Sequence, residues 1–165
     1  MDVLKTATEW SKAEMLSSSV FIFFGLIFLI ASLSFWQLGK TDVAKAYIIP
    51  MLVVGTLLMI LGVGLVASVQ WRASGFSTAL EADASAFVAA EILRAEKTID
   101  GYKTAVFLVM PVIIAISAVL IIFLNSPLWR ASLISIIAMM AVIIFVDSNA
   151  SARLEAYKSK LQQAQ

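Results

Sequence analysis

The residues of this chain most suited to chemistry are Glu91, Arg94 and Glu96, which fall within six positions of one predicted helix. A carboxylate beside a guanidinium can transfer protons or bind an ionic substrate. Charged side chains on the solvated face of a helix are nevertheless common. We therefore interpret these three as surface charges, and expect a protein that is not an enzyme and has no catalytic residues.

Most other side chains used in catalysis and ligand binding are missing. None of the 165 residues is Cys or His. This excludes disulfides, zinc sites built from Cys or His, haem held by either residue, and Cys–His or Ser–His catalysis. The chain also has no phosphate-binding glycine loop, dinucleotide fingerprint or zinc-protease pattern. We expect no cofactor, no metal site and no nucleic-acid partner.

The elements that must position any site are four stretches without a single Asp, Glu, Lys, Arg or His: Leu16–Leu38, Ala46–Trp71, Thr104–Trp129 and Ala131–Val146. Each is long enough, or nearly so, to cross a hydrocarbon core of ~30 Å as a helix. Only 14% of the residues are charged, against about a quarter in soluble domains. We predict one all-α membrane domain over residues 1–165, a polytopic four-transmembrane-helix bundle of two hairpins. The expected spans are about 16–38, 47–70, 104–124 and 128–146.

The basic residues predict the orientation. Four spans put both termini on one side, and that side carries nine of the twelve cations: Lys5, Lys12, Arg72, Arg94, Lys97, Lys103, Arg153, Lys158 and Lys160. The opposite side carries only Lys40, Lys45 and Arg130. Because cytoplasmic loops are enriched in Lys and Arg, we predict a bacterial inner (plasma) membrane protein with both termini cytoplasmic. Trp and Tyr favour membrane interfaces, and they fall near both ends of the spans.

Small residues indicate where helices approach closely. The first span has them at seven-residue spacing, and the second repeats the spacing with two glycines: Ser18, Gly25, Ser32 and Gly39, then Gly55 and Gly62. Small residues let helices in lipid pack together. Two interpretations remain open: packing within one bundle, or the interface with a second copy or a partner subunit. Pro111, inside the third span, is expected to kink its helix.

The soluble segments predict two further helices. Residues 77–99 contain no Gly or Pro and are rich in helix formers. We therefore expect an amphipathic cytoplasmic helix there, between spans 2 and 3, lying flat or strongly tilted along the membrane and ending at Asp100-Gly101. Its narrow face, which we name the alanine seam, consists of Ala79, Ala82, Ala86, Ala89 and Leu93. A C-terminal cytoplasmic helix, residues 147–164, is expected to extend span 4.

The tail helix has a face that can pack on the alanine seam. Its residues follow one another at alternating intervals of four and three positions, the spacing that the seam also has: Ala150, Leu154, Tyr157, Leu161 and Ala164. We expect the two to form a cytoplasmic cap, or a docking platform if the partner is another protein. The N-terminal segment before span 1, with Val3, Ala7 and Trp10 on one face, is expected to lie at the membrane–water interface and lead into span 1.

These features favour binding as the function. The leading hypothesis is a small integral membrane protein that contacts the lipid bilayer and binds another membrane protein or itself, as an accessory subunit, scaffold or protector. The alternative is a homo-oligomeric pore or a carrier for small uncharged solutes. Its candidate lining groups are Ser32, Ser34, Gln37, Thr56, Ser117 and Ser135. A membrane-active effector is the third possibility.

Overall fold

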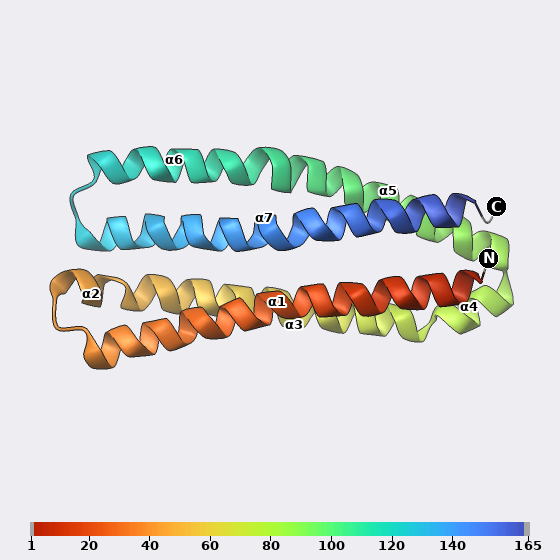
Figure 1. Cartoon of the computed structure of the whole chain (residues 1–165), viewed down its shortest axis with the longest axis horizontal. Helices are drawn as coiled ribbons and strands as arrows, with labels where there is room; N and C mark the ends of the chain where they lie inside the picture. The colour runs from red at the N-terminus through yellow and green to blue at the C-terminus, as the bar shows by residue number, and fades with distance from the viewer. Residues whose placement is uncertain (1, 164–165) are drawn as a thin grey trace.

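The computed structural model describes residues 2–163, and every regular element in that range is helical. The elements are α1 (Val3–Leu38), α2 (Asp42–Ala46), α3 (Ile48–Ser74), α4 (Phe76–Ala82), α5 (Ala84–Thr104), the π-helical turn η1 (Ala105–Val109), α6 (Met110–Phe123) and α7 (Pro127–Gln162). They form four long rods, because α2–α4 follow one another as one rod and α5–η1–α6 as another (Figure 1). Each rod is long and apolar enough to cross a membrane. This confirms the prediction of an all-helical protein with four membrane-length helices.

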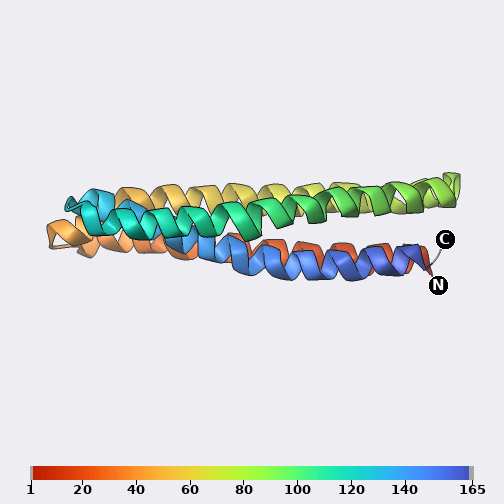
Figure 2. The ribbon, with the colours of Figure 1, turned by 90° about the horizontal axis from the view of Figure 1, so that it is seen from above.

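The rods lie along a common axis, as two perpendicular views show (Figures 1 and 2). Both termini and the α4–α5 junction are at one end, while α2 and the α6–α7 loop are at the other. We name the first the polar end and define it as residues 3–14, 72–103 and 147–162; the rest is the apolar part. Rods of 36 to 41 residues are ~54–62 Å long at 1.5 Å per residue. They therefore extend well beyond a hydrocarbon core of ~30 Å.

Glycines bring α1 and α3 into direct backbone contact. A Cβ atom added to Gly25 would lie 3.0 Å from the carbonyl oxygen of Gly55, and one added to Gly55 would lie 2.9 Å from that of Gly25. A Cβ on Gly62 would lie 2.7 Å from Cγ1 of Ile22. The Ser32 hydroxyl adds a hydrogen bond of 2.7 Å to the carbonyl oxygen of Ile48. These residues of the predicted small-residue faces thus pack inside the chain.

The third rod accommodates Pro111 by a change of helix type. Proline has no N–H, and its ring would collide with the carbonyl group four residues earlier, that of Phe107. Directly before it the chain forms the π-helical turn η1, in which the N–H of Met110 donates to the carbonyl oxygen of Ala105. Single π-helical turns are a known way to insert an irregularity into an α-helix. The predicted disturbance at Pro111 is therefore a local π-turn.

The predicted helix over 77–99 is wrong. The chain leaves helical geometry at Asp83 (φ −159°, ψ 102°), which separates α4 from α5 and reverses the direction of the chain (Figure 1). The Asp83 carboxylate accepts hydrogen bonds from the Ala86 N–H at 2.9 Å and the Ser85 hydroxyl at 2.8 Å. Asp is a preferred N-cap because it satisfies such free N–H groups. Helix propensity alone does not reveal this break, whereas an Asp at position 83 is a capping signal.

Two related expectations are also wrong. The segment does not lie across the ends of the other helices, because α4 and α5 run along the bundle axis as extensions of α3 and α6 (Figures 1 and 2). It also does not end at Asp100-Gly101, since α5 continues to Thr104 and directly into η1. The buried stripe of Ala95, Ile99 and Val106 continues past Gly101. Burial of that stripe outweighs the ~1 kcal/mol that glycine costs inside a helix.

We predict different effects for two glycine substitutions on α3. Gly55→Ala places a methyl group against the α1 backbone and should destabilise the fold by about 1–3 kcal/mol. Gly64→Ala is the matched control, because no atom lies within 4 Å of its added Cβ. It should leave stability unchanged or raise it by up to ~1 kcal/mol through helix propensity. Thermal unfolding in one detergent measures both, and equal effects would contradict this contact between α1 and α3.

Candidate functional site

All four rods contribute side chains to one buried cluster in the polar end. We name it the tryptophan cluster and define it as Trp10 of α1, Arg72 of α3, Glu91 and Arg94 of α5, and Tyr157 of α7. It lies in an apolar core that includes Ala7, Phe76, Phe87, Val88, Ala95, Ile99, Leu154 and Leu161. A second core, in the apolar part, is built from α1, α3 and α7. The two cores thus lie in different parts of the rods, one in the polar end and one in the apolar part.

Glu91 is the centre of the polar contacts in this cluster. It is 6% exposed, and Arg94 donates to both of its carboxylate oxygens, from Nε at 3.0 Å and from Nη2 at 2.8 Å. The Tyr157 hydroxyl donates to the same carboxylate at 3.0 Å and thereby links α7 to α5. Burial and the charge of Glu91 raise the pKa of Tyr157, so the hydroxyl keeps the proton that it donates. The expectation that Glu91 is a solvated surface charge is wrong.

Trp10 joins the remaining rods to this carboxylate site. Its ring stacks on Tyr157 with centroids 5.0 Å apart and an interplanar angle of 19°. The guanidinium carbon of Arg94 lies 4.6 Å from the Trp10 centroid, and that of Arg72 lies 4.9 Å away. Both distances are within the range of cation–π attraction. Trp10 is 8% exposed, so it is a core residue, and the expectation of an interfacial lead-in is wrong.

A second group of charges connects α1 to α7 nearer the apolar part. Arg153 pairs with Glu14 at 3.1 Å. Asp147, which directly follows the last charge-free stretch, forms no salt bridge with any residue in the range 2–163. Burial, reinforced by the charge of Glu14, raises the pKa of Asp147 to about 6. The carboxyl group at this boundary therefore takes up its proton at a higher pH than an ordinary aspartate does.

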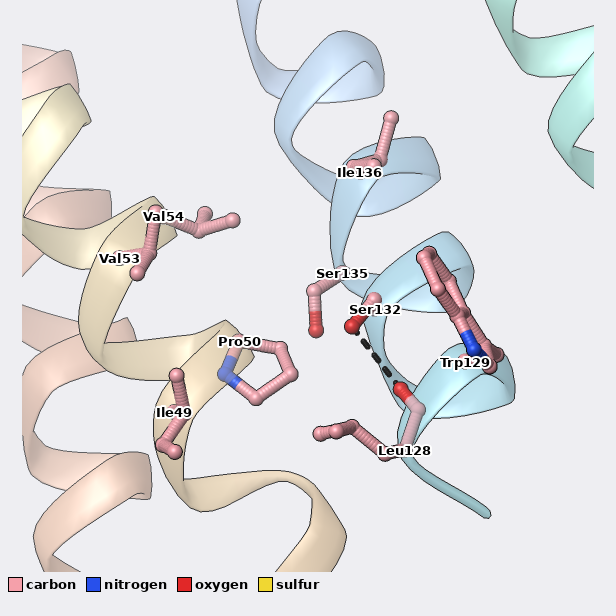
Figure 3. Close-up of a pocket in the computed structure, with 9 residues that line it drawn as sticks. All are labelled: Ile49, Pro50, Val53, Val54, Leu128, Trp129, Ser132, Ser135 and Ile136. Carbon is pink, nitrogen blue, oxygen red and sulfur yellow. Dashed lines mark hydrogen bonds between the residues drawn. The ribbon is translucent and has the colours of Figure 1, made fainter. Parts of the chain in front are cut away.

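The apolar part contains a separate pocket between α3 and α7, with a volume of about 300 Å³ (Figure 3). Pro50 and Val54 line it from α3, facing Ser132, Ser135 and Ile136 of α7. The two hydroxyls donate within α7, Ser132 to Leu128 at 2.9 Å and Ser135 to Ala131 at 2.8 Å. With those donors engaged, the pocket suits hydrocarbon rather than a polar solute.

The predicted site residues fall into three groups. Ser18, Gly25, Ser32, Gly55 and Gly62 are buried between helices of the same chain, and Gly39 is half-buried at the end of α1. Leu154, Tyr157 and Leu161 are buried in the tail, with Ala150 beside them, whereas Ala164 lies outside the described residues. All members of the alanine seam are exposed: Ala79, Ala82, Ala86, Ala89 and Leu93.

The tail therefore packs on α5, but through another face than the alanine seam. The face of α5 turned to α7 carries Val88, Glu91, Ala95 and Ile99, all buried. Their spacing of three, four and four residues is a helical stripe as regular as the alanine seam. A carboxylate inside such a stripe signals a buried, paired charge. The expected intramolecular contact of the alanine seam is wrong because alanine offers less apolar area than valine and isoleucine.

Comparison with models of protein families, with characterised proteins and with solved structures finds no match to this chain. Within residues 2–163 no three acidic side chains are grouped closely enough to hold a metal ion. The fold and the tryptophan cluster define a helical protein with four membrane-length rods and a polar end that has its own core.

We predict that Tyr157→Phe destabilises the polar end by ~1.5–3 kcal/mol, the usual contribution of a hydrogen bond to a charged group. Tyr102→Phe is the matched control, because the Tyr102 hydroxyl has no hydrogen bond within the described part of the chain. Chemical unfolding in detergent, followed by tryptophan fluorescence, measures both. If the two variants lose the same stability, the bond to Glu91 does not fasten α7 to α5.

Proposed function

We propose that this chain is a non-enzymatic integral membrane protein that binds another membrane protein, as an accessory, scaffold or protecting subunit. The observation that carries the proposal is an uncovered apolar helix face in the polar end. The face of α5 opposite the core presents Ala86, Ala89 and Leu93, and Leu93 is 68% exposed. Because this part of α5 lies beyond the charge-free stretches, hydrocarbon does not cover it. A small-residue face of this kind allows a second helix to approach closely.

The rigid support of this α5 face and the charges near it also favour binding. The tryptophan cluster ties α5 to the other three rods, so the exposed face is held in one orientation before a partner arrives. Preorganisation of this kind lowers the entropic cost of association. At the tip, Glu81 and Asp83 are exposed and form no salt bridge within residues 2–163. These charges favour a partner helix with Lys or Arg beside its small residues.

We further propose that the rods are four spans of a bacterial inner membrane, paired as two hairpins, with both termini in the cytoplasm. The support is the concentration of nine of the twelve basic residues in the polar end and the tendency of cytoplasmic segments to be basic. The exposed aromatic side chains agree, with Trp71 near one end of the apolar part and Trp36 and Trp129 near the other.

Cysteine labelling tests this orientation, since the natural chain has no Cys. Asp42→Cys and Ser126→Cys, both at exposed positions of the short loops, should react with a membrane-impermeant maleimide on intact cells. Lys97→Cys, exposed in the polar end, is the control and should react only after permeabilisation. The reverse pattern would reject the proposed topology.

Site-specific photocrosslinking tests the binding function. A photoreactive amino acid at position 89 should give one discrete adduct in native membranes, and Leu93→Glu should abolish it by placing a charge in the interface. Ser159→Glu is the matched control, because position 159 is an exposed site on α7 within the same polar end. An adduct with a second copy of this chain would identify the partner as itself. An absence of adducts at position 89, with the protein at its native abundance, would reject the proposal.

A further inference from the structure

The polar end has a groove between the second and third rods, with a volume of about 440 Å³. Its walls are Trp71 and Arg72 at the end of α3, Phe76 and Ala79 of α4, and Phe87 and Glu91 of α5. Phe76 and Phe87 meet edge to face with ring centroids 5.6 Å apart, and both are buried. The groove therefore combines an aromatic wall with one basic side chain.

Arg72 has no carboxylate partner. No acidic oxygen lies within 4.0 Å of its guanidinium among residues 2–163, and its buried Nε has no hydrogen-bond acceptor. The nearby carboxylate of Glu91 is already engaged by Arg94 and Tyr157. The cation–π contact with Trp10 is the compensation that the protein itself provides. Arg72 and Glu91 are the charged residues that line the groove. Because the Glu91 carboxylate is bound by Arg94 and Tyr157, Arg72 is the cation of the groove that lacks a carboxylate partner.

The level of Arg72 along the rod indicates what kind of anion reaches it. Arg72 directly follows the charge-free stretch that ends at Trp71, which places its side chain where lipid headgroups meet water. Trp71 is 82% exposed, as suits a ring at that boundary. The phosphate groups of phospholipids are the anions concentrated at this depth, and arginine binds phosphate through paired N–H groups.

We propose that the groove binds the phosphate of an anionic glycerophospholipid, with Arg72 as its counter-ion. The lipid belongs to the leaflet on the side of both chain termini. Its glycerol and headgroup lie along Ala79 and the Phe76–Phe87 wall, while its acyl chains remain beside the apolar surface of α3. This site is separate from the outward face of α5, so lipid and protein partner can be bound together.

Native mass spectrometry of the full chain in detergent tests the proposal, using phosphatidylglycerol and phosphatidylcholine with identical acyl chains. The wild type should retain one phosphatidylglycerol molecule in preference to phosphatidylcholine. Arg72→Gln should lower that retention roughly fivefold or more, the effect of losing one basic residue near anionic lipid. Arg72→Lys should recover part of it. Lys103→Gln is the matched control, a cation at a comparable depth whose side chain is exposed and paired with Asp100.

A second pair of variants leaves Arg72 in place. Ala79→Glu puts an acid into the groove at an exposed position and should also reduce retention, whereas Ala89→Glu, exposed on α5 outside the groove, should not. Unchanged retention in both Arg72→Gln and Ala79→Glu would overturn the proposal, as would equal retention of the two lipids. Displacement of phosphatidylglycerol by excess inorganic phosphate would assign the site to a free anion and overturn the lipid proposal.

Discussion

The length of the rods is the constraint on which the rest of the structure depends. Helices of 36 to 41 residues exceed the hydrocarbon thickness of a bilayer, so one bundle has to remain packed in two solvents. In hydrocarbon, association of helices yields little hydrophobic free energy, and close van der Waals contact replaces it. Gly25 and Gly55 supply that contact in the apolar part. In water, apolar burial drives packing, and a separate core forms in the polar end.

The tryptophan cluster complements those contacts because its interactions are directional. Apolar surfaces can slide along one another at small cost, whereas the paired hydrogen bonds from Arg94 and the single bond from Tyr157 require particular positions of Glu91. A buried ion pair is weak evidence for added stability, since desolvation offsets the attraction. Its physical consequence here is to fix how far α5 and α7 are displaced along each other. Trp10 and Arg72 extend that restraint to α1 and α3.

The turn at Asp83 determines which surfaces the polar end presents. It makes α4 and α5 two walls of one groove and turns the alanine-rich face of α5 outward. Had residues 77–99 formed one helix, Arg72 and Glu91 would have belonged to different parts of the molecule. The chain reversal at the N-cap Asp83 thus separates a groove with a basic side chain from a face of small apolar residues. These two surfaces suit different ligand chemistries, a phosphate and a helix.

Sequence alone was sufficient for features that depend on local chemistry. Charge-free stretches require helices in hydrocarbon, since backbone groups have no other partners there. The spacing of Gly25, Gly55 and Gly62 marked faces for close approach, and the three–four alternation of Leu154, Tyr157 and Leu161 marked the buried face of the tail. Only the tertiary structure decided which face meets which. α5 has two regular stripes. The one with larger side chains and a carboxylate for Arg94 and Tyr157 is buried, while the part of the alanine seam in α5, Ala86, Ala89 and Leu93, stays outside. That outcome depends on contacts between residues more than sixty positions apart, which periodicity within one helix does not specify.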